Sequence, residues 1–211
     1  LRRIAGLRER CVREQGIRYG INVLSERSLF SQSRYPRVNP LALHEFTSSG
    51  RVLYGTGIGG VGLPNFMSPA IRRFALWDIL ESRTILMASA PHLETQDRST
   101  LEQALRNAIW CTFRAAKDYL VAEGELATGK GAILMEFQEI NPRQELSSAL
   151  RQVLEARDHW EEVRVSRALL LDRLRASLDF VNGLAEYVQR QPSWPQPAFA
   201  GVVSPQSGPT H

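Results

Sequence analysis

The sequence has little of what marks an enzyme, a metal protein or a helical membrane protein. Its two cysteines, Cys11 and Cys111, lie far apart, and neither belongs to a CxxC motif or a Cys/His metal spacing. No run of eighteen apolar residues is present, which argues against a transmembrane helix. No GxSxG motif occurs, and the histidines fall in four separate segments: His44, His92, His159 and His211. We therefore predict no enzymatic activity and no cofactor or metal site.

Lysine is scarce, because Lys117 and Lys130 are the only two among 26 basic residues. The net charge of +4 is mildly basic, but arginines alternate with acidic residues along the chain. Charges mixed in this way are typical of a solvated helical surface, so we predict no nucleic-acid partner. The cysteines have apolar helical neighbours, and we expect small buried side chains rather than a disulfide.

The stretch from Pro142 to Val181 contains no glycine, and its only proline stands where the first helical turn would begin. Apolar residues recur along it at steps of three and four, which favours one amphipathic helix. A helix of this length would extend for about 60 Å, since each residue adds about 1.5 Å. The pattern therefore predicts an elongated rod packed against other long helices.

Four segments are expected in chain order. Residues 1–35 have helical periodicity, and residues 36–63 change to an alternating pattern that predicts two antiparallel strands, 38–46 and 52–61. Residues 64–190 return to helical periodicity and form the predicted long antiparallel, coiled-coil-like hairpin. Residues 191–211, rich in Pro, Gly, Ser and Gln, are predicted to be a disordered tail.

Helix boundaries inside the third segment have recognisable signals. Ser68 followed by Pro69 predicts a helix start, and Pro91 predicts a kink or an end. Either Asp97 or Ser99 is expected to begin the next helix, with Glu102 completing a capping box after Ser99. Three tryptophans stand on apolar helix faces and are predicted to be packing residues: Trp77, Trp110 and Trp160.

The second predicted strand is rich in glycine, and Gly55, Gly57 and Gly60 fit the G-x-G-x-x-G spacing of dinucleotide-binding loops. That fingerprint also needs a buried strand before it and a helix directly after it, whereas Pro64 and Pro69 delay the helix here. Glycines at alternate strand positions are better explained as the wall of a curved sheet or barrel.

Four stretches together resemble the C-terminal half of the outer-membrane efflux proteins, the TolC-like channels of Gram-negative bacteria. Arg34-Tyr35-Pro36 is similar to that family's helix-to-strand boundary, and YGTGIGGVGLP at 54–64 resembles its last barrel strand. TLEQALRN at 100–107 resembles the outward helix, and LEARDHWEEVRVSRALLLDRL at 154–174 resembles the returning helix. The spacing between these stretches is also similar.

The resemblance implies a trimer whose chains contribute strands to a shared outer-membrane barrel and helix pairs to a periplasmic helical barrel. Such a chain would be a passive conduit for efflux or secretion, in contact with outer-membrane lipid, a periplasmic adaptor and an inner-membrane pump. The turn between the two long helices would then meet the adaptor, and its residues are the predicted partner-binding site: Ile140, Asn141, Pro142 and Arg143.

Two alternatives stay open. One is a soluble helical scaffold or interaction protein without catalytic activity, which would be cytoplasmic rather than in the outer membrane and periplasm. The other is a helical protein that binds nucleic acid through its arginines. Because the chain starts at Leu1, we also expect it to be a piece of a longer product.

Overall fold

The computed structural model describes residues 41, 65–127, 129–140 and 143–195. The chain divides into two compact units, Leu1–Val38 with Ile58–Gly62 and Asn39–Gly57 with Leu63–His211, and every described residue belongs to the second. This described part is 84% helical and contains no strand. The prediction of a mainly helical protein is therefore confirmed.

The predicted small β part, with a transmembrane strand pair for an oligomeric barrel, is wrong for the described chain. Leu41, inside the first predicted strand, is helical and buried, and the rest of both predicted strands lies outside the described residues. Short stretches of alternating apolar residues occur in helices and strands alike, so periodicity alone did not separate the two. Within the described residues, no helix is long and apolar enough to cross a membrane.

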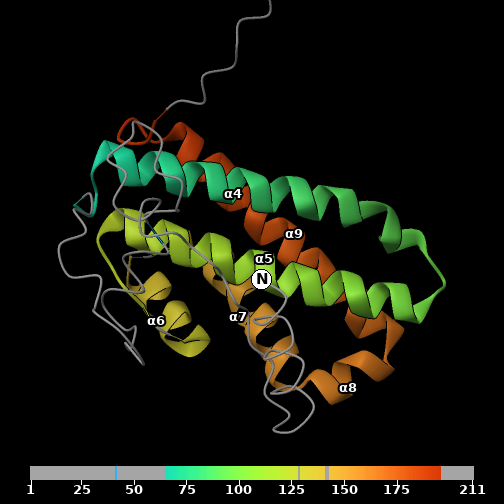
Figure 1. Cartoon of the computed structure of the whole chain (residues 1–211). Helices are drawn as coiled ribbons and strands as arrows, with labels where there is room; N and C mark the ends of the chain where they lie inside the picture. The colour runs from blue at the N-terminus through green and yellow to red at the C-terminus, as the bar shows by residue number, and fades with distance from the viewer. Residues whose placement is uncertain (1–40, 42–64, 128, 141–142, 196–211) are drawn as a thin grey trace, which may run out of the picture. The chain divides into compact units, whose positions relative to one another are not determined.

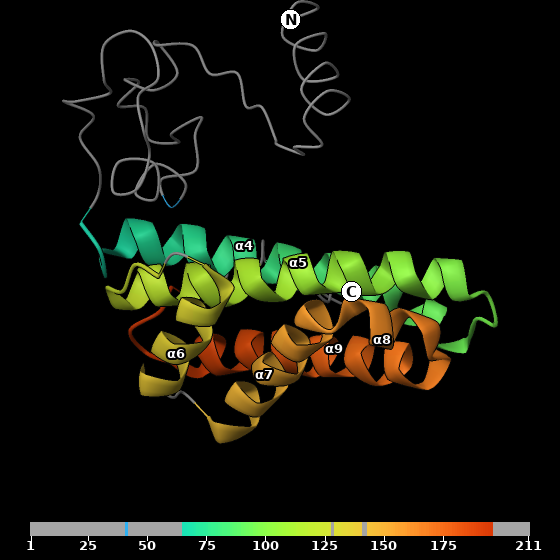
Figure 2. The same ribbon diagram turned by 90° about the horizontal axis from the view of Figure 1, so that it is seen from below.

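Two long helices form one side of the bundle. Helix α4 (Pro69–Ser89) is joined through the 3-10 turn η1 (Ala90–Glu94) to α5 (Arg98–Glu123), and the two helices lie side by side along their length (Figures 1 and 2). Ser68 caps α4 by accepting from Ile71 N at 3.3 Å, and Asp97 caps α5 by accepting from two backbone N–H groups at 3.1 Å. The expected start at Ser68 is confirmed, and of the kink or end expected at Pro91 the structure shows an end, since α4 stops at Ser89.

Shorter helices and one long helix form the other side. Helices α6 (Lys130–Ile140), α7 (Gln144–Asp158) and α8 (Trp160–Val165) are followed by α9 (Arg167–Arg190), which packs against α4, α5 and α7 (Figure 2). Gly124, in the left-handed conformation with φ of 101°, ends α5. The described helices thus enclose one apolar core between the two layers.

The predicted continuous helix over 142–181 is wrong, and so is the long hairpin built on it. The chain leaves the helical conformation at His159 (φ −107°, ψ 38°) and at Ser166 (φ −109°, ψ 112°). Because α7 packs directly against α9, the chain buries its apolar stripe by folding back on itself. Tertiary burial therefore outweighs the absence of local helix breakers.

An aromatic cluster closes one end of the core. Tyr119 stacks on Trp194 with ring centroids 5.8 Å apart, and it also contacts Phe137 at 5.5 Å and Tyr187 at 6.2 Å. The indole Nε1 of Trp194 donates to Glu123 Oε1 at 2.9 Å. Trp194 is 3% exposed, so the predicted disordered tail does not begin at residue 191. Residues 196–211 lie outside the described part.

Candidate binding surface and pocket

An ionic cluster joins α4 to α5. Arg114 Nη2 lies 2.7 Å from Asp78 Oδ1 and 2.7 Å from Glu81 Oε2, while Arg114 Nε lies 4.0 Å from Asp118 Oδ2. Burial opposes the charge of Arg114, but the carboxylates of Asp78 and Glu81 outweigh it and raise the pKa of the guanidinium. The arginine therefore stays charged and holds acidic groups from both helices.

Asp118 is the most deeply buried member of this cluster. Its side chain is 6% exposed, and Oδ2 accepts no hydrogen bond from the described residues. Burial first, and then repulsion from Asp78, raise the pKa of Asp118 well above the usual value of a carboxyl group. A buried carboxyl beside a second carboxylate favours the neutral form.

Two tryptophans on the outer face of these helices contradict the prediction that they pack in the core. Trp77 is 72% exposed and Trp110 is 55% exposed, whereas Trp160 is half-buried and packs against the core as predicted. Trp77 precedes Glu81 by one turn of α4, and Trp110 precedes Arg114 by one turn of α5. The Glu81–Arg114 ion pair thus stands between the two indoles. We call these four residues the α4–α5 face.

A pocket of about 280 Å³ lies between α5 and the start of α6. It is lined by the following residues: Trp110, Phe113, Arg114, Lys117, Asp118, Ala127, Gly129, Lys130 and Ile133. Both lysines of the chain are among them. We call this the α5–α6 pocket. The sequence analysis noted those two lysines without assigning them a role. The Gly-Lys-Gly triplet at 129–131 is the sequence signal that could have drawn attention to Lys130.

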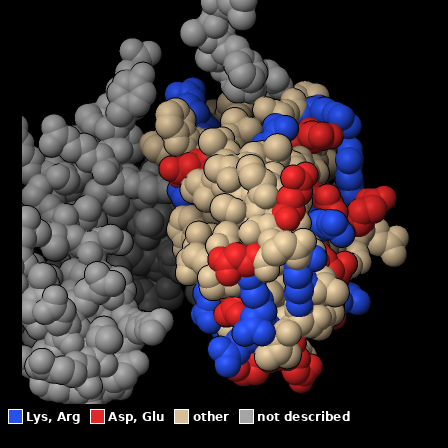
Figure 3. Space-filling model, turned by 90° about the vertical axis from the view of Figure 1, so that its right-hand side faces the viewer, with Lys and Arg blue, Asp and Glu red and all other residues tan. Residues whose placement is uncertain are grey.

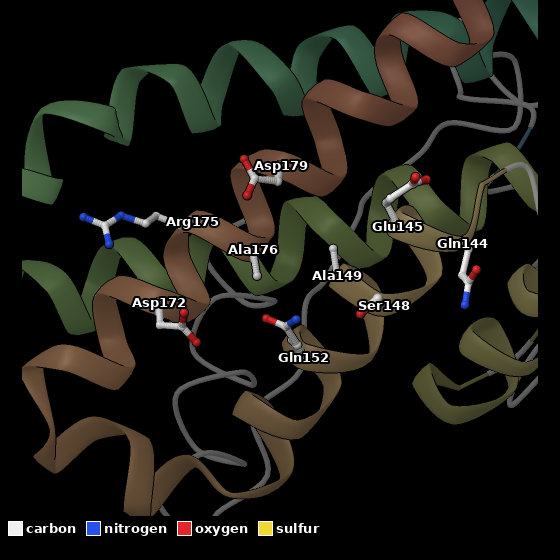
Figure 4. Close-up of a pocket in the computed structure, with 9 residues that line it drawn as sticks. All are labelled: Gln144, Glu145, Ser148, Ala149, Gln152, Asp172, Arg175, Ala176 and Asp179. Carbon is white, nitrogen blue, oxygen red and sulfur yellow. The ribbon is translucent and has the colours of Figure 1, made fainter.

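A larger groove of about 610 Å³ is lined by residues of both α7 and α9, on the surface beside their contact (Figure 4). Figure 4 shows Ala149 and Gln152 of α7 and Ala176 of α9 turned towards the space between the helices. All its charged lining residues are exposed: Glu145, Asp172, Arg175 and Asp179. Exposed side chains of this kind are solvated and do not fix a ligand's position, so the α5–α6 pocket is the stronger candidate.

The predicted partner-binding residues do not lie at the tip of a rod. Ile140 ends α6, and Arg143 precedes α7 with its guanidinium 5.8 Å from the ring centroid of Tyr187. Asn141 and Pro142 lie outside the described residues. The described ends of this connection join two helices of 11 and 15 residues, which pack against each other and against the bundle.

The residues described by the structure offer no group of three His, Cys, Asp or Glu side chains that could hold a metal ion. Cys111 is buried as predicted, and burial raises the pKa of its thiol to about 11, which disfavours a reactive thiolate. Cys11, His44 and His211 lie outside the described part. On the face shown in Figure 3, basic and acidic side chains are interspersed over the described residues.

Comparison with known proteins finds no family model, no curated protein and no solved structure that matches this chain.

Proposed function

We propose that this chain is a helical scaffold that works as a homo-oligomer, with copies associating through the α4–α5 face. The observation that carries the proposal is the exposure of Trp77 and Trp110 on either side of the Glu81–Arg114 ion pair. Tryptophan and arginine are the residues most enriched at the energetic centres of protein interfaces. An indole buried on association removes a large apolar surface from water.

A second copy fits this face better than a partner of one charge sign. The α4–α5 face carries the acid Glu81 and the base Arg114 between its apolar anchors. An interface between identical copies must be complementary to itself, and a patch with both signs of charge meets that condition. The interspersed charges in Figure 3 and the small net charge of +4 also keep repulsion between copies low.

The efflux-channel function was predicted from one long rod and a strand pair, and the described residues form neither. The adaptor, pump and lipid partners and the outer-membrane location depended on the same features. The channel function stays a prediction, and we prefer the alternative that needs only the packed helices and their exposed face.

The test is the mass of the purified full chain over the micromolar range, measured by sedimentation velocity. We expect the wild-type chain to be an oligomer and the Trp77→Ser/Trp110→Ser double variant to be a monomer. Val165→Ser and Met135→Ser are matched controls, because both side chains are 64% exposed but lie on other helices. All variants should keep the wild-type unfolding midpoint. A monomeric wild type, or an oligomeric double variant, would overturn the proposal.

A further inference from the structure

Lys130, the first residue of α6, is a partly buried cation that forms no ion pair with any described residue. Its ammonium lies 5.5 Å from the centroid of the Phe113 ring, and within the described chain no carboxylate stands within ion-pair distance. Burial first, and then the positive charge of Arg157, lower the pKa of Lys130, and the more weakly acting carboxylate of Asp158 opposes them. An ammonium held in such surroundings is stabilised by an anion brought in from solution.

The backbone around Lys130 is open to a ligand. Gly129 has φ of 91°, and a Cβ added at either Gly129 or Gly131 would meet no atom within 4 Å. Packing therefore does not require glycine at 131, although glycine weakens a helix relative to alanine. A glycine there does let a ligand approach the backbone closely. The first N–H groups of a helix lack partners within that helix and attract anions.

The α5–α6 pocket supplies the remaining contacts. Besides Lys130 it is lined by Arg114 and Lys117, and Asp118 brings a buried oxygen that accepts no hydrogen bond from the described chain. The raised pKa of Asp118 favours its neutral form, which can donate a hydrogen bond to an anionic oxygen. Trp110 adds an exposed aromatic wall on which a planar ring can stack.

We propose that the α5–α6 pocket binds a phosphate group, held by the Lys130 ammonium, the first backbone N–H groups of α6 and the Asp118 carboxyl. The phosphate is free in solution or belongs to a small molecule whose planar ring stacks on Trp110. The pocket shares Trp110 and Arg114 with the α4–α5 face. Lys130 and Gly131 lie outside that face, so variants at these two positions test the site separately from self-association.

The test is calorimetric titration of the full chain with inorganic phosphate and with adenosine 5′-monophosphate. Lys130→Ala should weaken binding of both by about tenfold or more, since a hydrogen bond to a charged group is lost. Gly131→Ala should weaken binding while raising the unfolding temperature, because alanine stabilises a helix but blocks the approach to the backbone. If Gly131 served only the fold, Gly131→Ala would change the unfolding temperature without weakening binding.

Arg98→Ala is the matched control, since this exposed base stands in the first turn of α5 and does not line the pocket. It should bind as the wild type does. Tighter binding of the nucleotide that is lost in Trp110→Ala but kept in Trp77→Ala, whose side chain does not line the pocket, would assign the phosphate to a ring-bearing molecule. Equal binding of the two probes would assign it to free phosphate. If the wild type binds neither probe, or if Lys130→Ala binds as tightly as Arg98→Ala, the proposal is overturned.

Discussion

Arg114 and Asp78, 36 positions apart in the sequence, meet at 2.7 Å and tie α5 to α4. Asp78 is 6% exposed, and the Arg114 side chain is 24% exposed. The same guanidinium nitrogen also reaches Glu81. Charges removed from water to this extent depend on each other, because each one compensates the cost of burying the other.

Replacing Arg114 by methionine should destabilise the protein by about 3 kcal/mol, because it leaves buried carboxylates without their counter-ion. Urea unfolding at neutral pH measures the change. The control is Arg164→Met, which breaks the 2.6 Å pair with Glu161 between two exposed side chains and should cost less than about 1 kcal/mol. Equal losses in the two variants would contradict a structural role for the cluster.

Replacing Asp118 by asparagine should change how stability depends on pH. The pKa of Asp118 is raised in the folded state, so this group's contribution is fully present below its unfolded pKa of about 3.9 and is lost as pH rises through the folded value. Asparagine cannot ionise. The variant should therefore lose less stability than the wild type between pH 4 and neutral pH. Urea unfolding across that range measures the free energy of unfolding of both proteins. If the two free energies change with pH in parallel, Asp118 does not hold a proton in the folded state.

Gly183 marks a close approach of α9 to α7. A Cβ added there would lie 2.7 Å from Leu146 Cδ2, and Leu146 is buried. Gly183→Ala gains up to about 1 kcal/mol of helix propensity but forces the leucine to move, which costs about 1–3 kcal/mol. We expect a net loss of stability.

Adding Leu146→Ala removes the obstacle. The free energy of unfolding of the double variant should therefore exceed the value expected from adding the two single effects by about 1 kcal/mol or more. A double-mutant cycle by chemical denaturation measures this coupling. Additive effects would mean that the two helices separate to admit the methyl group.

Local chemistry predicted the parts of the fold that depend on a few neighbouring residues. Ser68 with Pro69 begins a helix, Asp97 was one of the two expected starts of the next, and the helix ends before Pro91. Each signal works because a side chain or a proline ring acts on backbone groups within one turn. The ion pairs of Arg114 join residues of different helices, and a single sequence does not reveal such contacts.

Periodicity failed where solvent exposure had to be assigned. Trp77 and Trp110 recur at helical spacing with apolar neighbours, yet α4 and α5 bury the faces beside them and leave both indoles outside. Which face of a helix becomes buried depends on where its neighbours pack, and this is a property of the tertiary structure. The pocket was missed for the same reason, because Lys117 and Lys130 come together only when α6 packs on α5.

The break at Ser166 offers the most direct test of why the predicted continuous helix does not form. Ser166 Oγ accepts from Leu169 N at 3.4 Å, and the Ser166 carbonyl accepts from Leu170 N at 3.0 Å, so the residue begins α9 in an extended conformation. Val163 before it and Leu170 after it are both buried, and the turn allows both to reach the core.

Ser166→Ala should therefore keep the break but lose the cap, at a cost of about 1 kcal/mol. Ser166→Asp, which keeps a capping oxygen and adds a charge that favours a helix N-terminus, should be at least as stable as the wild type. Thermal unfolding followed by circular dichroism measures both variants. An increase in helix content in Ser166→Ala would instead show that the serine itself, rather than burial on either side of it, interrupts the helix.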